Sequence, residues 1–365
     1  MKKNKFKYLA IIFILTIFSC VGFSSYGKEC SIYNKTELNK SNLNNEKKNV
    51  AVGNYYLAED NWLLGKFSKI IPKEKMTIYS DAINKLSEVS KSQNKDVYFV
   101  SMTHKTNMLK HLYPEFVNNK DNIDLNKNLL KSQLDKNIIS FIDIDEYFSS
   151  KFTESEREKF YFKTDHHWNG IGAFEGFKFM IKNMDVGLSD DKLDDYLNQY
   201  KSKEVKDKEF LGSYNRKLKF IVKEKEFANY KYKKGSKLEY FISDGSKDRK
   251  VNEKDIMATL RNKDKWDYGG AYMRGTNCNI LKIKNSNPLV DKKVLVFRDS
   301  YQAPMTWLLA DAFSEVEIVD PRYIENIDMT YNQIIRNSDS DIVMFMYNSF
   351  GFEGMIQEMI NKGIR

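Results

Sequence analysis

The residues best suited to chemistry are Asp165, His166, His167 and Trp168, which place a carboxylate beside two imidazoles in a chain that has only four histidines. A carboxylate that pairs with an imidazole prepares the ring to accept a proton from a weak nucleophile. These residues therefore predict general-base chemistry, for which another part of the chain must supply the nucleophile.

Ser300 is the predicted nucleophile. It follows an apolar run at residues 294–297, after Arg298 and Asp299, and a segment with a helical pattern comes next. A serine in such a strand–turn–helix setting is held exposed above the edge of a sheet. Taken alone this motif is weak, because a serine before a helix is also an ordinary N-cap.

The surrounding elements alternate between strand and helix patterns. We expect strands at residues 97–100, 138–142, 294–297, 316–319 and 342–346, and helices at residues 78–92, 105–117, 125–134, 168–184, 304–313 and 324–336. Strands separated by helices predict a mostly parallel sheet with helices on both faces. Ligands gather at the carboxyl ends of such strands, where Ser300 and Asn348 both fall.

Residues 186–290 interrupt this alternation. Charged residues dominate the segment, and short strand candidates occur at residues 218–222, 238–242 and 280–283. We interpret the segment as a strand-rich insertion whose loops face the substrate.

Residues 1–27 predict a signal peptide or an N-terminal membrane anchor. A basic start is followed by an almost wholly apolar run at residues 8–23. This run lies between the length of a signal-peptide core and that of a membrane span. Cleavage near Gly27, retention as an anchor and lipid attachment at Cys20 therefore stay open. Each outcome places the protein outside the cytoplasm, anchored to the cell membrane or secreted.

A polar segment, residues 28–51, is rich in Asn, Lys, Ser and Glu and predicts a flexible linker before a domain at residues 52–365. Beyond the apolar run the cysteines are Cys30 and Cys278, which could pair in an oxidising compartment. No Cys/His spacing predicts a metal site.

The formal net charge is +9, and four of these charges precede the apolar run. The remaining lysines are scattered among acids, without the arginine and aromatic pattern of a nucleic-acid binder, so no nucleic-acid partner is expected. A weak attraction to anionic cell-surface polymers stays compatible with this charge.

The stretch at residues 160–174 resembles the DHHW proteins and the wider AlgX/AlgJ-like group of SGNH-hydrolase-fold proteins. Weaker matches at residues 54–65, 97–114 and 320–323 extend the resemblance over most of residues 52–365. The resemblance implies an α/β fold of the SGNH-hydrolase-like (flavodoxin-like) type, with a mostly parallel sheet flanked by helices.

The same resemblance implies roles for three residues. Asp165 orients the base, His167 is the base and Ser300 is the nucleophile of a Ser-His-Asp triad. The chain order is permuted relative to ordinary SGNH esterases, in which the serine comes first. His166 is offset from His167 by one residue, and we interpret it as a packing or supporting residue.

Five further residues are candidates for contacts with the substrate or the oxyanion: Tyr301, Asn348, Arg298, Arg322 and Tyr323. Arg298 stands where SGNH enzymes usually have a glycine, which raises the alternative that the fold is retained without the chemistry. Gly275 and Asn277 are candidates for a second oxyanion donor.

Several polar residues are expected to have no role in catalysis. His104 and His111 are predicted to lie at the surface. Asp143 and Asp145 follow a predicted strand and are interpreted as solvated loop residues.

The resemblance implies an extracytoplasmic acetyltransferase or esterase that acts on a cell-envelope polysaccharide through an acyl-serine, without a cofactor or metal. Its implied partners are the polysaccharide and a membrane-bound O-acyltransferase that supplies the acyl group. The alternative is a non-catalytic exported glycan-binding or accessory protein. A third interpretation, a sporulation or envelope-assembly interaction protein, rests only on export and the linker.

Overall fold

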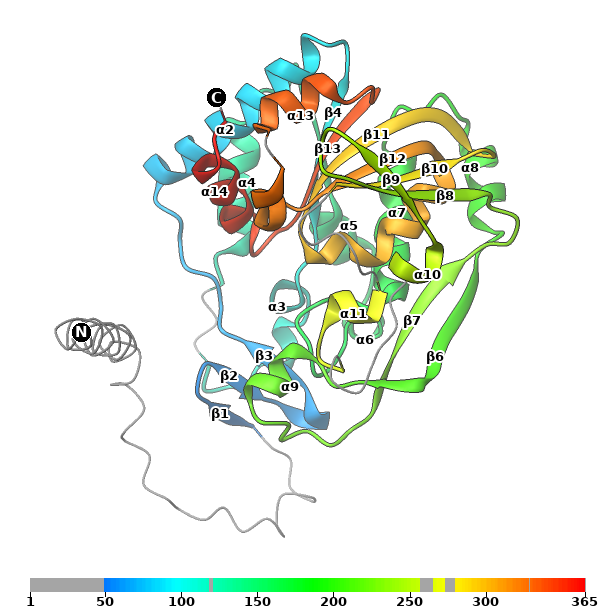
Figure 1. Ribbon diagram of the computed structural model, residues 1–365. Coiled ribbons are helices and arrows are strands. Elements are labelled where there is room, and N and C mark those ends of the chain that lie inside the picture. The colour runs from blue at the N-terminus through cyan, green and yellow to red at the C-terminus, as the bar shows by residue number, and fades with distance from the viewer. Residues whose placement is uncertain (1–48, 118–120, 257–264, 273–279, 328, 365) are drawn as a thin grey trace, which may run out of the picture. The chain divides into compact units, whose positions relative to one another are not determined.

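The computed structural model describes residues 49–117, 121–256, 265–272, 280–327 and 329–364 (Figure 1). The predicted signal or anchor, nearly all of the predicted linker, Cys30 and Cys278, and the oxyanion candidates Gly275 and Asn277 lie outside the described residues. In the described part of the chain, no helix is long and apolar enough to cross a membrane.

An eight-stranded sheet lies at the centre, in the order β5-β4-β13-β11-β12-β10-β8-β9. The first five strands in this order are parallel. They are β5 (Ile139–Asp143), β4 (Asp96–Met102), β13 (Ile342–Asn348), β11 (Val290–Arg298) and β12 (Phe313–Val319). The predicted α/β class with a mostly parallel sheet is confirmed.

The segment interpreted as an insertion contributes three antiparallel strands to the same sheet: β10 (Ile280–Asn285), β8 (Leu238–Ser243) and β9 (Asp248–Val251). It also forms a separate antiparallel pair, β6 (Lys201–Phe210) and β7 (Glu226–Tyr232). The predicted strand at residues 218–222 is wrong. Lys219 and Phe220 have φ angles of 57° and 59°, in the left-handed region that a strand does not use.

Helices cover both faces of the sheet (Figure 1). One face carries α2 (Lys73–Lys91), α4 (Ile123–Gln133), α13 (Tyr331–Asn337) and α14 (Phe352–Asn361), and the other carries α5 (Ile144–Lys151), α7 (Gly170–Lys182) and α12 (Thr306–Ala312). Successive residues of β11 point to opposite faces, so Val294 and Val296 are buried on the α7 side, and Leu295 and Phe297 on the α2 side. This two-sided burial holds the end of β11 in place.

Shorter elements complete the described chain. A three-stranded antiparallel sheet is formed by β1 (Val50–Val52), β2 (Tyr55–Leu57) and β3 (Leu63–Gly65). The remaining helices are η1 (Glu59–Asn61), α3 (Lys105–Met108), η2 (Lys110–Leu112), α6 (Glu154–Glu158), α8 (Asp190–Leu197), α9 (Ser213–Lys217), α10 (Glu253–Ile256), α11 (Tyr268–Tyr272), η4 (Ser300–Met305) and η5 (Pro321–Asn326).

Three predicted helices are shorter or divided. The helix expected at residues 105–117 is limited to α3 and η2, which are separated by the non-helical Leu109. The helix expected at 304–313 is η4 followed by α12, and Phe313 already belongs to β12. The helix expected at 324–336 is divided into η5 and α13, and Thr330 begins α13 with a capping box.

The prediction that Asp143 and Asp145 are solvated is wrong, since both are buried. The Nζ of Lys127 lies 2.9 Å from Asp143 and 3.9 Å from Asp145. Asp143 also accepts the backbone N–H of Glu146 and so caps α5. These carboxylates therefore fix a helix to the sheet.

Candidate active site

Ser300 lies directly beyond the carboxyl end of β11, where it begins η4 and is partly exposed. The buried side chain of Asp299 holds this turn. One carboxylate oxygen accepts the Tyr301 N–H at 2.8 Å, and the other accepts the backbone and side-chain N–H of Asn348 at 2.7 and 2.6 Å. Burial raises the pKa of Asp299, and the hydrogen bonds from Asn348 and Tyr301 oppose that shift.

The loop between α6 and α7 brings His167 and Asp165 to Ser300. The Nε2 of His167 lies 2.7 Å from the Ser300 Oγ, and its Nδ1 lies 2.5 Å from the Asp165 Oδ1. With Nδ1–H donated to the carboxylate, Nε2 is left to accept the serine proton. The structure therefore brings the three predicted triad residues within hydrogen-bond reach of one another.

Asp165 is fully buried, and its partners favour the charged form. Burial alone would raise its pKa, but the neighbouring imidazoles of His167 and His166 and the hydrogen bonds from His167 and Ser213 hold the pKa well below its usual value. The Ser213 N–H donates to Oδ2 at 2.6 Å. Asp165 is therefore an anion at neutral pH and can balance the positive charge of a protonated His167.

Ser213 reaches Asp165 because Gly212 comes before it. Gly212 has a φ of 67°, and a Cβ built there would lie 2.2 Å from the carbonyl oxygen of Thr164. Only glycine allows this close approach of the two backbones. This contact could not be predicted from the sequence, because nothing in the spacing of Ser213 connects it with Asp165.

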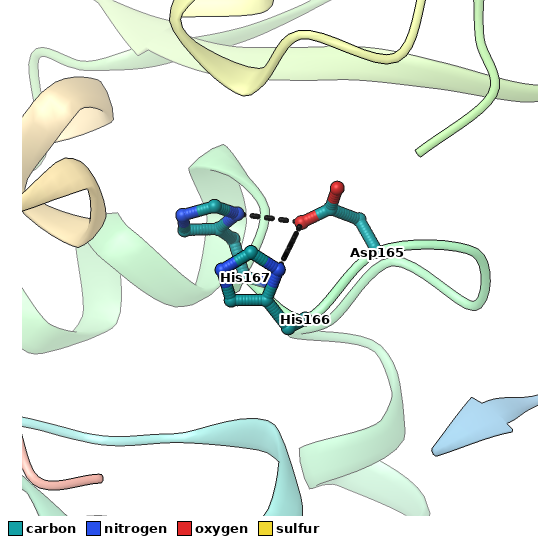
Figure 2. Close-up of side chains that lie close together, drawn as sticks. All are labelled: Asp165, His166 and His167. Atoms are coloured by element: carbon teal, nitrogen blue, oxygen red, sulfur yellow. Dashed lines mark hydrogen bonds and ion pairs between the residues drawn. The ribbon is translucent and has the colours of Figure 1, made fainter. Parts of the chain in front are cut away.

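His166 supports the same carboxylate from the side. Figure 2 shows the rings of His166 and His167 both directed at one oxygen of Asp165. The Nδ1 of His166 lies 3.3 Å from that oxygen and 3.0 Å from the Ser213 Oγ. Burial and the neighbouring charge of His167 lower the pKa of His166 to about 3, so its ring is neutral at neutral pH.

Two groups among the described residues have the spacing of metal ligands: Asp165, His166 and His167, and Glu315, Glu317 and Asp339. In the first group, both ring nitrogens of His167 already face protein partners. In the second group, each carboxylate pairs with a lysine. The donor atoms of both groups therefore serve contacts within the protein.

Tyr268 of α11 covers one face of the base. Its ring is parallel to the imidazole of His167 within 3°, with the ring centroids 3.7 Å apart, and its hydroxyl donates to the Trp168 carbonyl at 2.8 Å. An aromatic face attracts a cation, so this contact strengthens when His167 becomes an imidazolium. Tyr268 could not be predicted from the sequence, because it lies about a hundred residues from the Asp-His-His-Trp motif.

Replacing Tyr268 with leucine is expected to reduce kcat/KM for a small acetyl ester about 5- to 30-fold and to shift the acid limb of the pH–rate profile to lower pH, because the imidazolium loses its aromatic neighbour. Tyr268→Phe keeps the ring and is the matched control, so its profile should follow that of the parent. Identical profiles in the leucine variant and the parent would contradict this role.

Lys105 connects the motif to β3. Its buried ammonium group contacts the carbonyl oxygens of Leu63 and Phe162 at 2.7 Å, and those of Lys163 and Asp165 at 2.9 Å. Burial lowers the pKa of Lys105, and the charges of Glu226 and Asp165 oppose this shift. The four carbonyl acceptors favour the protonated form, which holds the loop in place.

The Lys105→Met substitution is expected to lower the free energy of unfolding by about 3–5 kcal/mol, because the buried carbonyl groups lose their donor. Urea denaturation followed by circular dichroism measures this loss. Lys85→Met changes an exposed lysine of α2 and should stay within about 0.5 kcal/mol of the parent. Equal effects of the two substitutions would show that Lys105 is not a structural cation.

The prediction that His104 lies at the surface is wrong, whereas His111 is exposed. The ring of His104 stacks on Phe350 with centroids 4.5 Å apart, and its Nδ1 accepts the Thr106 N–H. Burial, reinforced by the nearby His166, holds the pKa of His104 well below its usual value. The side chain is therefore neutral in the folded protein.

Because the folded pKa of His104 lies below the unfolded value, stability is lost as the pH falls through the unfolded pKa. Lowering the pH from 7 to 5 is expected to remove about 2 kcal/mol of unfolding free energy through this residue. Urea denaturation at both pH values measures the loss, and His104→Gln should reduce the difference. An unchanged pH dependence in that variant would assign the effect to other groups.

The five candidates for substrate and oxyanion contacts lie around this sheet edge, and each has a partner within the protein; the Tyr323 N–H donates to the Asp320 carbonyl at 3.0 Å. Tyr301 and Asn348 donate to Asp299, as described above. The guanidinium of Arg298 lies 3.4 Å from the buried Asp320, whose carboxylate also accepts three hydrogen bonds from Arg322, two from its guanidinium and one from its backbone N–H. Tyr323 is partly exposed on η5.

The N–H of Ser300 is left at the start of η4. The Tyr301 N–H donates to the Asp299 side chain, the Gln302 N–H donates to the Asp299 carbonyl, and the Ser300 N–H is absent from the hydrogen bonds that the described residues make. A backbone N–H at this position can stabilise an oxyanion that forms beside the serine.

Comparison with known proteins shows the family to which the chain belongs. Residues 56–240 match the family described as SGNH hydrolase-like domain, acetyltransferase AlgX. The chain belongs to this AlgX family. Membership confirms the resemblance to the AlgX/AlgJ-like group and the predicted SGNH-hydrolase-like fold.

Solved structures resemble this AlgX-family chain over most of its length. Bacillus cereus PatB1, in a structure described as carrying a sulfonyl adduct, is 23% identical, with a TM-score of 0.67 over 82% of this chain and 96% of PatB1. A DHHW family protein from Eubacterium siraeum is 17% identical, with a TM-score of 0.69 over 87% of this chain and 98% of that protein. No curated protein matches the sequence.

Proposed function

We propose that this protein transfers an acyl group, most simply acetyl, to a hydroxyl group of a cell-surface polysaccharide through an acyl-Ser300 intermediate. The observation that carries this proposal is the continuous contact from the Ser300 Oγ to the His167 Nε2 and from the His167 Nδ1 to Asp165. The AlgX family, whose description names an acetyltransferase, supports the choice of acetyl.

In the first half-reaction, the Ser300 Oγ attacks the carbonyl carbon of the donor, and its proton passes to the His167 Nε2. The Ser300 N–H faces the developing oxyanion. When the tetrahedral intermediate collapses, the bond to the leaving group breaks, and His167 returns the proton to that group. Asp165 keeps the imidazole in the required tautomer and balances its positive charge.

In the second half-reaction, a sugar hydroxyl attacks the acyl-serine, and His167 accepts the hydroxyl proton. Collapse forms the new ester and returns that proton to the Ser300 Oγ. Water in place of the sugar gives hydrolysis, so exclusion of water determines whether the protein is a transferase or an esterase. The proposal includes an extracytoplasmic location and a membrane-bound O-acyltransferase that supplies the donor.

Two measurements test the proposal. A serine-directed fluorophosphonate should add one adduct to the parent, visible by intact mass, and none to Ser300→Ala. With 4-nitrophenyl acetate as donor, adding an oligosaccharide should convert part of the released acetate into acetylated sugar. Absence of both adduct and acetyl release would instead favour the non-catalytic glycan-binding alternative, and acetate without acetylated sugar would favour an esterase.

A further inference from the structure

A cavity of about 660 Å³ lies between the β6–β7 pair and the helices α11 and α12. Its walls come from β6, β7, the turn that leads into β8, β8 itself, the start of α10, the end of α11, and α12. The volume falls in the range of small-ligand pockets, about 300–1,000 Å³. Ser300 is not among its lining residues, so the cavity is separate from the triad itself.

Five of the sixteen described residues that line the cavity are aromatic: Tyr230, Tyr232, Tyr240, Tyr272 and Trp307. The rings of Tyr230 and Tyr232 lie 6.2 Å apart, and those of Tyr240 and Trp307 lie 6.1 Å apart, edge to face. Tyrosine and tryptophan combine an apolar ring with a polar group. A pyranose has the matching character, with a C–H face and a rim of hydroxyl groups.

The charged side chains of the cavity balance one another. Its described lining contains three lysines and three acids: Lys203, Lys231, Lys233, Glu204, Glu253 and Asp311. The Nζ of Lys203 lies 5.9 Å from the ring centre of Tyr230, and the buried Asp311 accepts the Tyr200 hydroxyl at 3.2 Å. A polyanion would meet as many carboxylates as ammonium groups, so this lining suits a chain of little net charge.

Two elements connect the cavity to the triad. Tyr268 at the start of α11 stacks on His167, while Tyr272 at its end lines the cavity, and the two rings lie 4.9 Å apart. The Trp307 indole N–H donates to the Tyr272 carbonyl at 3.4 Å, and its helix, α12, continues directly from the η4 turn that Ser300 begins. A ligand in the cavity therefore contacts the same two elements that hold the base and the nucleophile.

We propose that this cavity is an acceptor subsite that binds pyranose units of a polysaccharide with little net charge. This inference rests on the proposed acyl transfer, for which it names the class of acceptor. Aromatic rings stack on the sugar faces, while the lysines and acids bond the hydroxyl groups. The subsite holds the acceptor chain beside α11, which begins at Tyr268, and α12, which follows the η4 turn of Ser300.

The test measures binding and ester hydrolysis separately, on the full-length protein in a sugar-free detergent. Calorimetry compares neutral tetrasaccharides of glucose, galactose and N-acetylglucosamine with tetragalacturonate. At least one neutral tetrasaccharide should bind more tightly than tetragalacturonate. Trp307→Ala and the milder Tyr232→Ala should each weaken that binding about 10-fold, while hydrolysis of 4-nitrophenyl acetate stays within about twofold of the parent.

Phe116→Ala removes an exposed aromatic ring that does not line the cavity, and it should change neither measurement. Failure of every neutral sugar to bind, tighter binding of tetragalacturonate, or unchanged binding in both cavity variants would overturn the subsite. Ser300→Ala should bind the sugar normally. Sugar binding in a protein that releases no acetate would refute the proposed acyl transfer and leave the cavity as a glycan site.

Discussion

The Ser300→Ala protein is expected to lose at least about 10⁴-fold in kcat for acetyl release from 4-nitrophenyl acetate. Without the serine nucleophile, only the slow direct attack of water on the ester remains. The fold should be unaffected, since the Ser300 side chain is partly exposed and makes its contact with His167 alone among the described residues. Spectrophotometric release of 4-nitrophenolate, with circular dichroism and a melting curve, measures both properties.

Ser314→Ala is the matched control for this experiment. Ser314 is also partly buried, and its Oγ donates to the Lys292 carbonyl in the same sheet, away from the triad. The control should retain the parental rate. If the Ser300 variant remained fully active, the acyl-serine mechanism would be refuted, whatever the state of the cavity.

Asp165→Asn is expected to lower kcat by about 10⁴-fold with little change in KM. The amide would present an N–H to the Nδ1 of His167, so Nε2 would carry the proton and could no longer accept one from Ser300. The release of 4-nitrophenolate from 4-nitrophenyl acetate measures the change. Because Asp165 also accepts the Ser213 N–H, the variant needs a melting curve beside the kinetics.

The comparison for this variant is Asp81→Asn, an isosteric change at an exposed carboxylate of α2. It should leave both the rate and the melting temperature at the parental values. A folded Asp165 variant with near-normal kcat would mean that another group orients the imidazole. His166, whose Nδ1 also faces Asp165, would then be the residue to replace next.

The five parallel strands were predictable because strands buried on both faces are short apolar runs. Four of the five predicted runs lie inside observed strands, and the fifth, residues 138–142, begins one residue before β5. The pair β6–β7 was not predicted, since the sequence of β6 is mostly charged and shows no apolar run. Such a pair is held by backbone hydrogen bonds between its strands and by contacts with the helices that it packs against. Neither kind of contact is visible in a local sequence pattern.

Some residues of the candidate site were also predictable from the sequence, and others were not. Asp165, His167 and Ser300 could be named from their types and motifs, and the structure places them in mutual contact. Ser213 and Tyr268 could not be named, because their contacts depend on the tertiary fold. The burial of His104 and Lys105 was also out of reach, since polar residues are mostly exposed and a single one has no periodicity.

The contact between Ser213 and Asp165 has a consequence for when Ser300 becomes reactive. His167, Ser213 and Ser300 come from three separate segments of the chain. Asp165 and Ser213 are 48 positions apart in the sequence, and His167 and Ser300 are 133 positions apart. A chain that has been only partly synthesised therefore carries an ordinary, unactivated hydroxyl. Reactivity towards a fluorophosphonate should appear only after the strands that follow Ser300, β12 and β13, have joined the sheet. The rate at which this reactivity appears during refolding therefore measures the completion of the fold.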